Sequence, residues 1–386
     1  MRMRGNLRLS AIAVVTVALC ALALYGQYNN PNDAVAVDLP ADVRLAFESK
    51  QFESSEIRPR GGALVIDLDG EIRLRNTSMD RIRGITVAVS SSDGALGGRA
   101  VVSVPSLNVA PGESFPLKLN MRLLRPLPAP AGAIVHAAVD GVLYDTLAFA
   151  GPNLLDSERK MTVREMEARR DREYFQAMLA SEGRGGIVDA MQSSLRRQAE
   201  RPTLSARLAG RSGAAIAGAD EPREVALAMV GSTDAPVLMQ GGSALVTGLY
   251  SDAPSLRLTN RSNERVRSFE LGWLIRDTDG TLYSAGSVPM ETVRPLDAGA
   301  AFASSTNQKF AFRPARSNSR ATIDSMSVYV RNAQFADGRI WIPSRADLEA
   351  ASLLDVVPVS AEEQRLTSLY RERGPAAVIE ELRKFE

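Results

Sequence analysis

Two short acidic segments carry oxygen ligands at a spacing that could bind a cation. Asp67–Glu71 and Asp277–Thr281 both run Asp-x-Asp-Gly-x, as the first residues of many calcium-binding loops do. An EF-hand loop also needs further oxygen ligands and a bidentate glutamate at its twelfth position, and neither segment continues in that way. Because both segments lie between strand-like runs, we expect hairpin turns here and no metal site.

Patterns that would support covalent or phosphate chemistry are incomplete. Ser157–Lys160 has the Ser-x-x-Lys spacing of penicillin-binding enzymes, but no Lys-Thr-Gly follows it and it opens a charged helix. Gly94–Gly98 lacks the Lys-Ser/Thr ending of a phosphate loop. A pair of carboxylates, as in glycoside hydrolases, stays open as an alternative, because no sequence feature selects one pair.

Cysteine and histidine are too few for the usual metal and nucleophile sites. Cys20 and His136 are the only residues of their types, which excludes an intramolecular disulfide, a Cys-ligated zinc and a histidine cluster. His136 lies in an apolar run, and we expect it to pack within a strand. The sequence therefore predicts no catalytic, cofactor-binding or metal-ligating residue, no cofactor, and a protein that is not an enzyme.

Three other groups of residues could recognise a ligand, and each also has a structural interpretation. Asn76–Ser78 and Asn260–Ser262 are formal glycosylation acceptors, yet asparagine also shapes turns at strand ends, which is the role we expect. A set of arginines could bind anions or, since side chains alternate along strands, form a solvated outer face. These are Arg73, Arg81 and Arg83, with Arg257, Arg265 and Arg267 at the corresponding positions of a repeat. Trp273 and Trp341 could be carbohydrate platforms, although we expect core packing.

That repeat organises the elements that would position these residues. Ile72–Ile85 returns as Leu256–Phe269 with similar residue types at matched positions, among them Asn76 with Asn260. Self-similarity of this kind indicates that one structural unit is used twice. Around both copies, short runs of β-branched residues alternate with turn dipeptides, which is typical of antiparallel β-sandwiches.

The strand rhythm and the Asn-x-Ser turn resemble those of immunoglobulin and fibronectin type III domains. The paired cysteines and the tryptophan that mark antibody domains are absent. The resemblance implies tandem Ig-like β-sandwich domains of a membrane-anchored bacterial envelope protein. Such domains usually work through their edges and loops.

The first residues have the pattern of an export signal. Arg2, Arg4 and Arg8 precede the apolar run Leu9–Tyr25, which is short for a membrane-spanning helix and long for a signal-peptide core. Cleavage at Ala21–Ala23 is an alternative, but apolar residues continue beyond it, so we expect an uncleaved anchor in the lipid bilayer. With the arginines inside, the body would face the periplasm from the bacterial inner membrane, held by a single span.

The sequence thus predicts a mainly β fold with helical insertions. We expect an N-terminal transmembrane helix, two duplicated Ig-like antiparallel β-sandwiches joined by a helical hairpin and a linker, and short C-terminal helices. The segments are a signal anchor (1–26), a juxtamembrane linker (27–60) with one pairing strand near Val43–Phe47, a first sandwich (61–153), a helical hairpin (154–200), a flexible linker (201–223), a second sandwich (224–343) and C-terminal helices (344–386). Capping boxes at Thr162–Glu165 and Ser360–Glu363 mark two expected helix starts, and Ser344–Asp347 opens another helix.

Composition limits the classes of partner. The chain has 386 residues and a formal net charge of +1, so no long-range field directs it to nucleic acid. Helical segments with thin apolar stripes, together with sandwich edges and loops, favour other membrane or envelope proteins as partners. We expect a non-enzymatic interaction or scaffold protein, a structural accessory subunit that stabilises a larger membrane complex, for example a respiratory or photosynthetic one. The alternatives are a carbohydrate-binding or adhesion module of the envelope and a hydrolase that uses carboxylates alone.

Overall fold

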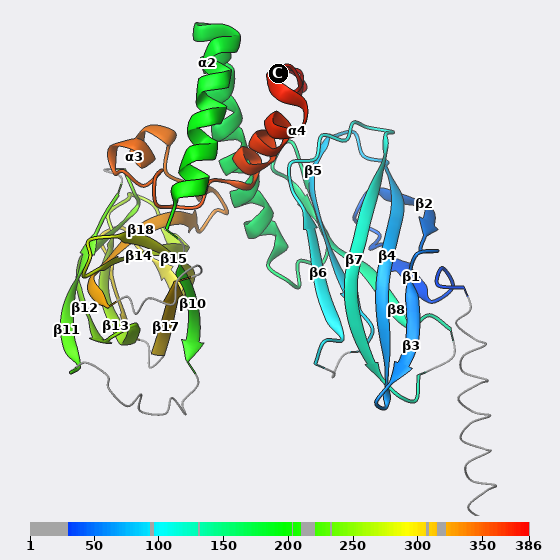
Figure 1. Cartoon of the computed structure of the whole chain (residues 1–386), viewed down its shortest axis with the longest axis horizontal. Coiled ribbons are helices and arrows are strands. Elements are labelled where there is room, and N and C mark those ends of the chain that lie inside the picture. The colour runs from blue at the N-terminus through cyan, green and yellow to red at the C-terminus, as the bar shows by residue number, and fades with distance from the viewer. Residues whose placement is uncertain are drawn as a thin grey trace, which may run out of the picture. The chain divides into compact units, whose positions relative to one another are not determined.

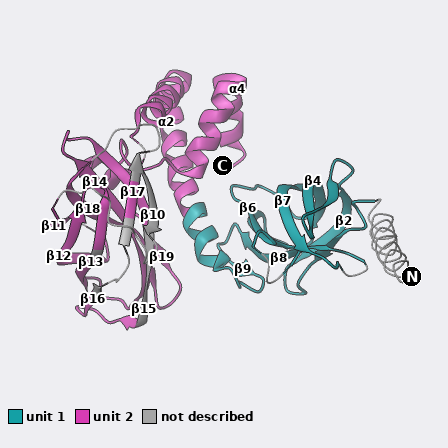
Figure 2. Ribbon diagram, turned by 60° about the horizontal axis from the view of Figure 1, so that its bottom comes forward, with its two compact units in different colours: residues 1–165 teal, residues 166–386 magenta. Residues whose placement is uncertain are grey.

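The chain divides into two compact units, residues 1–165 and 166–386 (Figure 2). The computed structural model describes residues 30–92, 96–129, 132–202, 204–209, 221–231, 234–305, 309–314 and 322–385. In this part of the chain strands predominate, and three helices accompany them (Figure 1). The boundary between the units falls within the first of these helices.

The first unit contains two sheets. One has the order β1 (Val35–Asp38), β8 (Val135–Tyr144), β5 (Ile82–Ser90) and β6 (Arg99–Val104), with β9 (Phe149–Ala150) also paired to β8. The other is built on β4 (Ala63–Asn76), which pairs with β2 (Leu45–Gln51), β3 (Glu56–Arg60) and β7 (Ser114–Pro126). Strand β1 runs parallel to β8, whereas the other pairs are antiparallel.

One apolar core joins these two sheets. Alternate residues of β4 and β5 point inward, so that Ile72 and Leu74 from one sheet and Ile85 and Val87 from the other are at most 1% exposed. Burial of each such side chain contributes about 1.5–3 kcal/mol. The period-2 pattern of the sequence therefore does place the core.

The second unit contains a single ten-stranded sheet. Its main path is β10 (Leu204–Ala209), β17 (Lys309–Pro314), β13 (Tyr250–Asn260), β12 (Val237–Thr247), β11 (Arg223–Met229), β18 (Ile323–Phe335), β14 (Val266–Asp277) and β15 (Leu282–Leu296), with β16 (Ala301–Ser305) on β13 and β19 (Ile340–Trp341) on β18. Strand β10, at one end of this path, lies next to β15 at the other end. The sheet is therefore nearly closed and barrel-like.

Strand β11 is what makes one sheet out of two. Its first half, Arg223–Ala226, pairs antiparallel with β12, and its second half, Leu227–Met229, pairs parallel with β18. The corresponding first-unit strand, β1, pairs only with β8 among the strands that the structure describes. A strand that passes from one sheet to the other joins their hydrogen-bond ladders.

The predicted fold class is therefore wrong. Two antiparallel Ig-like sandwiches were expected, but both units contain a parallel pair, and the second unit is a nearly closed barrel-like sheet. Local alternation cannot distinguish these cases, because it sets which face of a strand is buried and not which strand lies beside it. Residues 27–60, expected to be a linker with one strand, instead contain β1, β2 and β3.

The membrane anchor predicted at residues 1–26 lies outside the described residues. Within the part of the chain that is described, no helix is both long enough and apolar enough to cross a bilayer.

The sequence repeat corresponds to a repeated pairing scheme. Strands β4, β5, β6, β7 and β8 pair as β13, β14, β15, β16–β17 and β18 do. At the ends of β4 and β13, Asn76 and Asn260 are fully buried. The amide of Asn76 donates to Asp80 O (2.8 Å) and Val109 O (3.2 Å), and that of Asn260 donates to Glu264 O (2.7 Å) and Leu296 O (2.9 Å).

A serine completes each of these turns. Ser78 and Ser262 donate through Oγ to the Oδ1 of the preceding asparagine, at 2.7 Å in both units. The same Oγ also lies within hydrogen-bond distance of a carbonyl two residues further on, Asp80 O (2.8 Å) or Glu264 O (3.0 Å), to which its one hydrogen can be donated instead. Because the asparagine side chains are buried and hydrogen-bonded, the expected turn role is confirmed and glycosylation at Asn76 or Asn260 is excluded.

The hairpin turn expected at Asp67–Glu71 does not form, because Gly70 lies inside a strand, and Gly141 also lies inside one. Gly70 is within β4, where a Cβ would collide with Gln51 O and the Phe52 ring, and Gly141 is within β8 against the Phe149 ring. Glycine here permits close approach of another segment, which is its other role in strands. By contrast, Asp337-Gly338 does form a hairpin turn, with Gly338 at φ 91° between β18 and β19.

The three helices are α2 (Ser157–Glu200), α3 (Arg345–Ala350) and α4 (Ala361–Arg383). Helix α2 begins five residues before the expected Thr162 capping box, whereas Ser344 and Ser360 do cap α3 and α4. Gly183 (φ 68°) interrupts α2 and Gly374 (φ 78°) interrupts α4, so each consists of two arms. Positive φ angles are readily adopted only by glycine, so these two glycines set the positions at which α2 and α4 break.

The buried asparagines predict a matched pair of destabilised variants. Asn76→Asp and Asn260→Asp each replace a donor with a carboxylate that faces two carbonyl oxygens, and each should lower the free energy of unfolding by about 3 kcal/mol. Both tryptophans lie in the second unit, so urea unfolding followed by tryptophan fluorescence reports Asn260→Asp, and amide hydrogen exchange reports Asn76→Asp. The control is Asn120→Asp, since Asn120 is exposed and solvent screens the new carboxylate from that of Asp69, which Asn120 contacts at 3.2 Å. Equal effects of Asn76→Asp and Asn120→Asp would contradict this role.

Candidate functional site

The strongest concentration of buried charge lies in the helical part of the second unit. The arms of α2 and α4 enclose a small apolar cluster of Phe175, Ile187, Met191, Leu366, Val378 and Leu382. Beside it are carboxylates that are almost fully buried, among them Asp171 (0% exposed), Glu362 (1%) and Glu363 (1%). Charged groups are seldom buried unless they are paired, so this cluster is the first candidate for a functional site.

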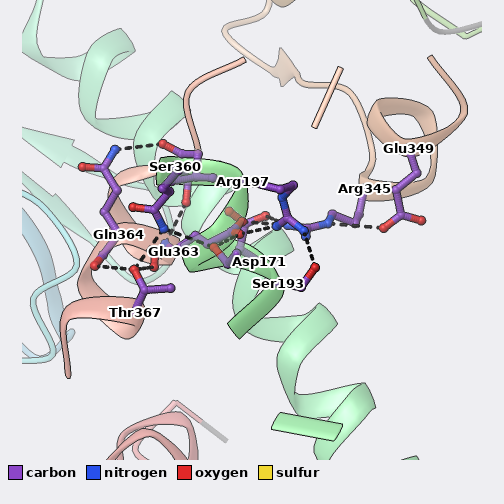
Figure 3. Close-up of polar contacts among 12 residues, drawn as sticks. Asp171, Ser193, Arg197, Arg345, Glu349, Ser360, Glu363, Gln364 and Thr367 are labelled. Atoms are coloured by element: carbon purple, nitrogen blue, oxygen red, sulfur yellow. Dashed lines mark hydrogen bonds and ion pairs between the residues drawn. The ribbon is translucent and has the colours of Figure 1, made fainter. Parts of the chain in front are cut away.

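Glu363 is the centre of the first ion-pair network (Figure 3). Its Oε1 accepts from Ser194 Oγ (2.5 Å) and Arg197 Nη2 (2.7 Å), both on α2, and its Oε2 accepts from Arg345 Nη1 (2.8 Å) on α3. Arg345 also lies 3.6 Å from Asp171 Oδ1 and 4.3 Å from the Tyr174 ring centroid. One carboxylate therefore connects three helices.

The electrostatics of this network favour the ionised carboxylate. Burial by itself would raise the pKa of Glu363, but Arg345, Ser194 and Arg197 outweigh it and hold the pKa below its usual value. Oxygen Oδ2 of the neighbouring Asp171 is buried and has no hydrogen-bond partner among the described residues. Glu363 is therefore retained as a charge among the packed helices.

A second network ties the two arms of α4 to α2. Arg365 donates to Glu362 (2.7 Å) and to Glu381 (2.6 Å), which lie on opposite sides of the break at Gly374. Glu362 is also 3.4 Å from Arg172 of α2. This arginine-bridged pair of acids fixes the angle between the arms.

A third network holds α2 to the barrel-like sheet. Arg331 of β18 lies 3.5 Å from Glu167 of α2 and 3.3 Å from Glu270 of β14, and Asn332 donates to Glu270 (2.9 Å). Two carboxylates thus share one guanidinium. Burial raises the pKa of Glu167, and Arg331 and Arg170 offset this only in part.

These networks have the chemistry of structural ion pairs. A carboxylate pair that hydrolyses a glycosidic bond must reach the substrate, one group as acid and the other as base or nucleophile. Each acid in the three networks is instead bound by at least one arginine, within or beneath packed helices. In the described residues, no group of three or more His, Cys, Asp or Glu side chains could hold a metal ion.

The residues singled out in the sequence are dispersed. Ser157 is buried at the start of α2 and donates to Asp140, so it is held as part of a helix terminus. Trp273 is 7% exposed in the core, whereas Trp341 is half-buried and donates to Asp234 (3.3 Å). His136 is wrongly predicted as packed, because its side chain is 50% exposed and lies 3.4 Å from Asp38.

The arginines predicted as a possible stripe do not form one. Arg73 lies on β4 and pairs with Glu71 (3.1 Å), while Arg83 lies on β5 in the other sheet and contacts Asn108 (2.7 Å). The two acidic segments also differ from each other. Asp67 and Asp69 lie inside β4, while Asp277 forms the expected turn by accepting from the backbone N–H of Thr281 (2.8 Å).

Sequence reasoning did not identify the charged networks. The sequence marks Glu363 only as the last residue of a capping box, because its partners Ser194 and Arg345 are remote in sequence. The available signal was the excess of acidic residues in the first turn of α4 together with the arginines of α2. Local pattern cannot assign partners between them.

Comparison with known proteins gives no family. No protein-family model and no curated protein matches the chain. Among solved structures, β-glucosidase from Kluyveromyces marxianus in complex with glucose is 9% identical over 76% of this chain, with a TM-score of 0.17. Its Se-Met labelled form is 8% identical over 71% of this chain and 46% of that chain, with a TM-score of 0.16. An allantoicase is 8% identical over 68% of this chain and 80% of that chain, with a TM-score of 0.07.

The chain spans only about half the length of the β-glucosidase chain, 47% in the glucose complex. TM-scores this low carry no conclusion about the fold or the function.

The charged networks predict opposite effects of the same substitution at two positions. A carboxyl whose folded pKa is lowered stabilises the fold above its unfolded pKa, and this is lost as the pH falls through the folded pKa. Glu363→Gln should therefore cost about 3 kcal/mol at pH 7 and less in acid. A carboxyl with a raised folded pKa destabilises the ionised fold, so Glu167→Gln should increase stability at pH 7, with the gain shrinking in acid.

The measurement is urea unfolding followed by tryptophan fluorescence between pH 4 and pH 8. Both substitutions remove one charge from the same helical layer, so each serves as the control for the other. Destabilisation of similar size by both variants would contradict the assigned pKa directions.

Proposed function

We propose that the protein is a non-enzymatic, membrane-anchored extracytoplasmic interaction protein, a structural accessory subunit that stabilises a larger membrane protein complex. The observation that carries this proposal is the use of the buried charges. The acids of the helical layer are bound to arginines that hold α2, α3 and α4 together, as Glu363 is to Arg197 and Arg345. These buried groups hold the helices together, so we assign the function of the protein to its surface residues.

The surface of the first unit supports an interaction role. Several large apolar side chains there are well exposed, including Leu96 (97%), Met79 (82%) and Val101 (56%). Isolated exposed apolar residues are common. Those on strands and hairpin turns, however, are in the positions through which β domains bind partners.

The proposed location follows from the N-terminal sequence. Leu9–Tyr25 would lie in the bacterial inner membrane, with the arginines before it in the cytoplasm and both units in the periplasm. Anchorage would keep the units close to membrane complexes and raise their effective concentration there.

Co-purification tests this function. The full chain, extracted from its native membranes in a mild detergent, should elute with one or more other envelope proteins in a reproducible ratio. A chain in which Leu9–Tyr25 is replaced by a cleavable signal peptide should move to the soluble periplasmic fraction and lose most of this association. A clean monomer in every preparation would contradict the proposal.

Carbohydrate binding is the second candidate, and one observation favours it. Trp341 is half-buried near the surface of the second unit, and its indole N–H is held by Asp234 (3.3 Å), so its ring is fixed in place. A stacking platform of this kind would lose about 1–2 kcal/mol of glycan affinity on Trp341→Ala. Binding to a glycan array, weakened about tenfold by Trp341→Ala and retained by Trp341→Phe, would support this function in place of the first.

A further inference from the structure

Strand β6 forms an open sheet edge in the first unit. It pairs along its whole length with β5, from Arg99 against Ser90 to Val104 against Ile85, and with no other described strand. Its sequence, Arg-Ala-Val-Val-Ser-Val, is rich in β-branched residues, and its ladder has no bulge. Proteins usually protect such edges with bulges, prolines or lysines, and β6 contains none of these.

The backbone groups of β6 that have no hydrogen-bond partner among the described residues can be assigned. Ser91 N donates to Gly98 O (2.7 Å) across the β5–β6 ladder, and Leu124 N donates to Gly97 O (2.9 Å) from the opposite side. Because backbone groups alternate sides along an antiparallel strand, those of Val101 and Ser103 point away from β5. Val101 is also 56% exposed.

The inner face of β6 is incompletely covered. Ala100, Val102 and Val104 pack against the core of the first unit, yet all three remain only partly buried. Strand β7 of the other sheet lies beside β6 (Figure 1) but pairs only with β4 among the described strands. The side chains on this face of β6 therefore remain partly accessible to solvent.

The second unit indicates what fits such an opening. Its strands β15 and β17 occupy the places that β6 and β7 occupy in the first unit. There the strand β10 pairs antiparallel with β17 and lies next to β15. In the second unit, therefore, an extended segment covers the side of the sheet that stays uncovered in the first unit.

Charge restricts the occupant further. Arg99 at one end of β6 and Arg164, which donates to Ser103 Oγ (3.1 Å) at the other end, are both exposed. A strand laid along β6 would therefore have a basic residue near each of its ends. Acidic residues flanking an apolar centre would complement this arrangement.

From these observations we propose that the β6 edge is the docking site for an extended segment of a partner protein, which adds a strand to the sheet by pairing with Val101 and Ser103. The segment has apolar residues at alternate positions, which cover Ala100, Val102 and Val104, and acidic residues at its ends. This inference rests on the proposed function and names the surface that performs it.

The experiment uses the full chain in native membranes, with a photoreactive amino acid at position 101 and, as the control site, at position 154, which is more exposed but lies outside any strand. Mass spectrometry should map the position-101 cross-links to one segment of one envelope protein with acidic ends and alternating apolar residues.

Val101→Pro removes only an amide that points away from β5, and edge strands tolerate proline in that orientation. It should reduce recovery of this partner at least about tenfold, whereas Val101→Thr, which keeps the N–H, should not.

Two further measurements keep the outcomes distinct. Amide exchange at Val101 and Ser103 should be fast in the purified chain and slow in the complex. Val101→Lys keeps the N–H but adds edge protection and should also weaken recovery. Wild-type recovery of the partner by Val101→Pro, cross-links between two copies of this chain, or slow exchange in the purified chain would overturn the docking site while leaving the accessory function standing. Absence of any co-purifying protein in wild type would instead overturn the proposed function, and this site with it.

Discussion

The constraint on which both units depend is that the chain passes between two strands that do not pair with each other, from β4 to β5 and from β13 to β14, without losing its backbone hydrogen bonds inside the core. Asn76 and Asn260 meet this constraint at equivalent places. Each amide is fully buried and donates to two carbonyl groups from different segments. An unpaired buried carbonyl costs about 1–3 kcal/mol. An asparagine side chain, whose amide group has two donor hydrogens and one acceptor oxygen, therefore stabilises the connection between the strands. The strands on either side of this asparagine turn pair in the same scheme in both units.

The packing of helices α2, α3 and α4 depends on buried ion pairs more than on apolar contacts. Its apolar cluster is small, and much of its specificity comes from buried pairs such as Glu363 with Arg345. Desolvation of two charges offsets much of their attraction, so such pairs add little net stability when they form. Loss of one partner is costly, however, and the pairs therefore select one arrangement of the arms around the breaks at Gly183 and Gly374.

The two units differ in how far their sheets are completed. In the second unit β11 bridges the two halves of the sheet and β10 fills the remaining side, which leaves a nearly closed barrel. In the first unit β1 pairs only with β8 among the described strands, and the β6 edge remains open. The sheet of the second unit is thus completed by its own strands. In the first unit, the edge of β6 and the partly buried Val102 and Val104 remain accessible to a partner. This asymmetry is consistent with a protein that acts by binding.

The sequence by itself determined the local features of this protein. Alternation placed the core residues of β4 and β5, Ser344 and Ser360 marked helix starts, and the matched Asn-x-Ser segments identified the repeat. These features depend on residues a few positions apart, whose geometry is set by backbone stereochemistry. Tertiary structure alone decided that β11 joins two sheets, that Gly70 and Gly141 lie within strands, and that Glu363 binds Ser194 and Arg345. Those outcomes depend on which remote segments meet, and strand partners and ion pairs across a core leave no periodic signal in the chain.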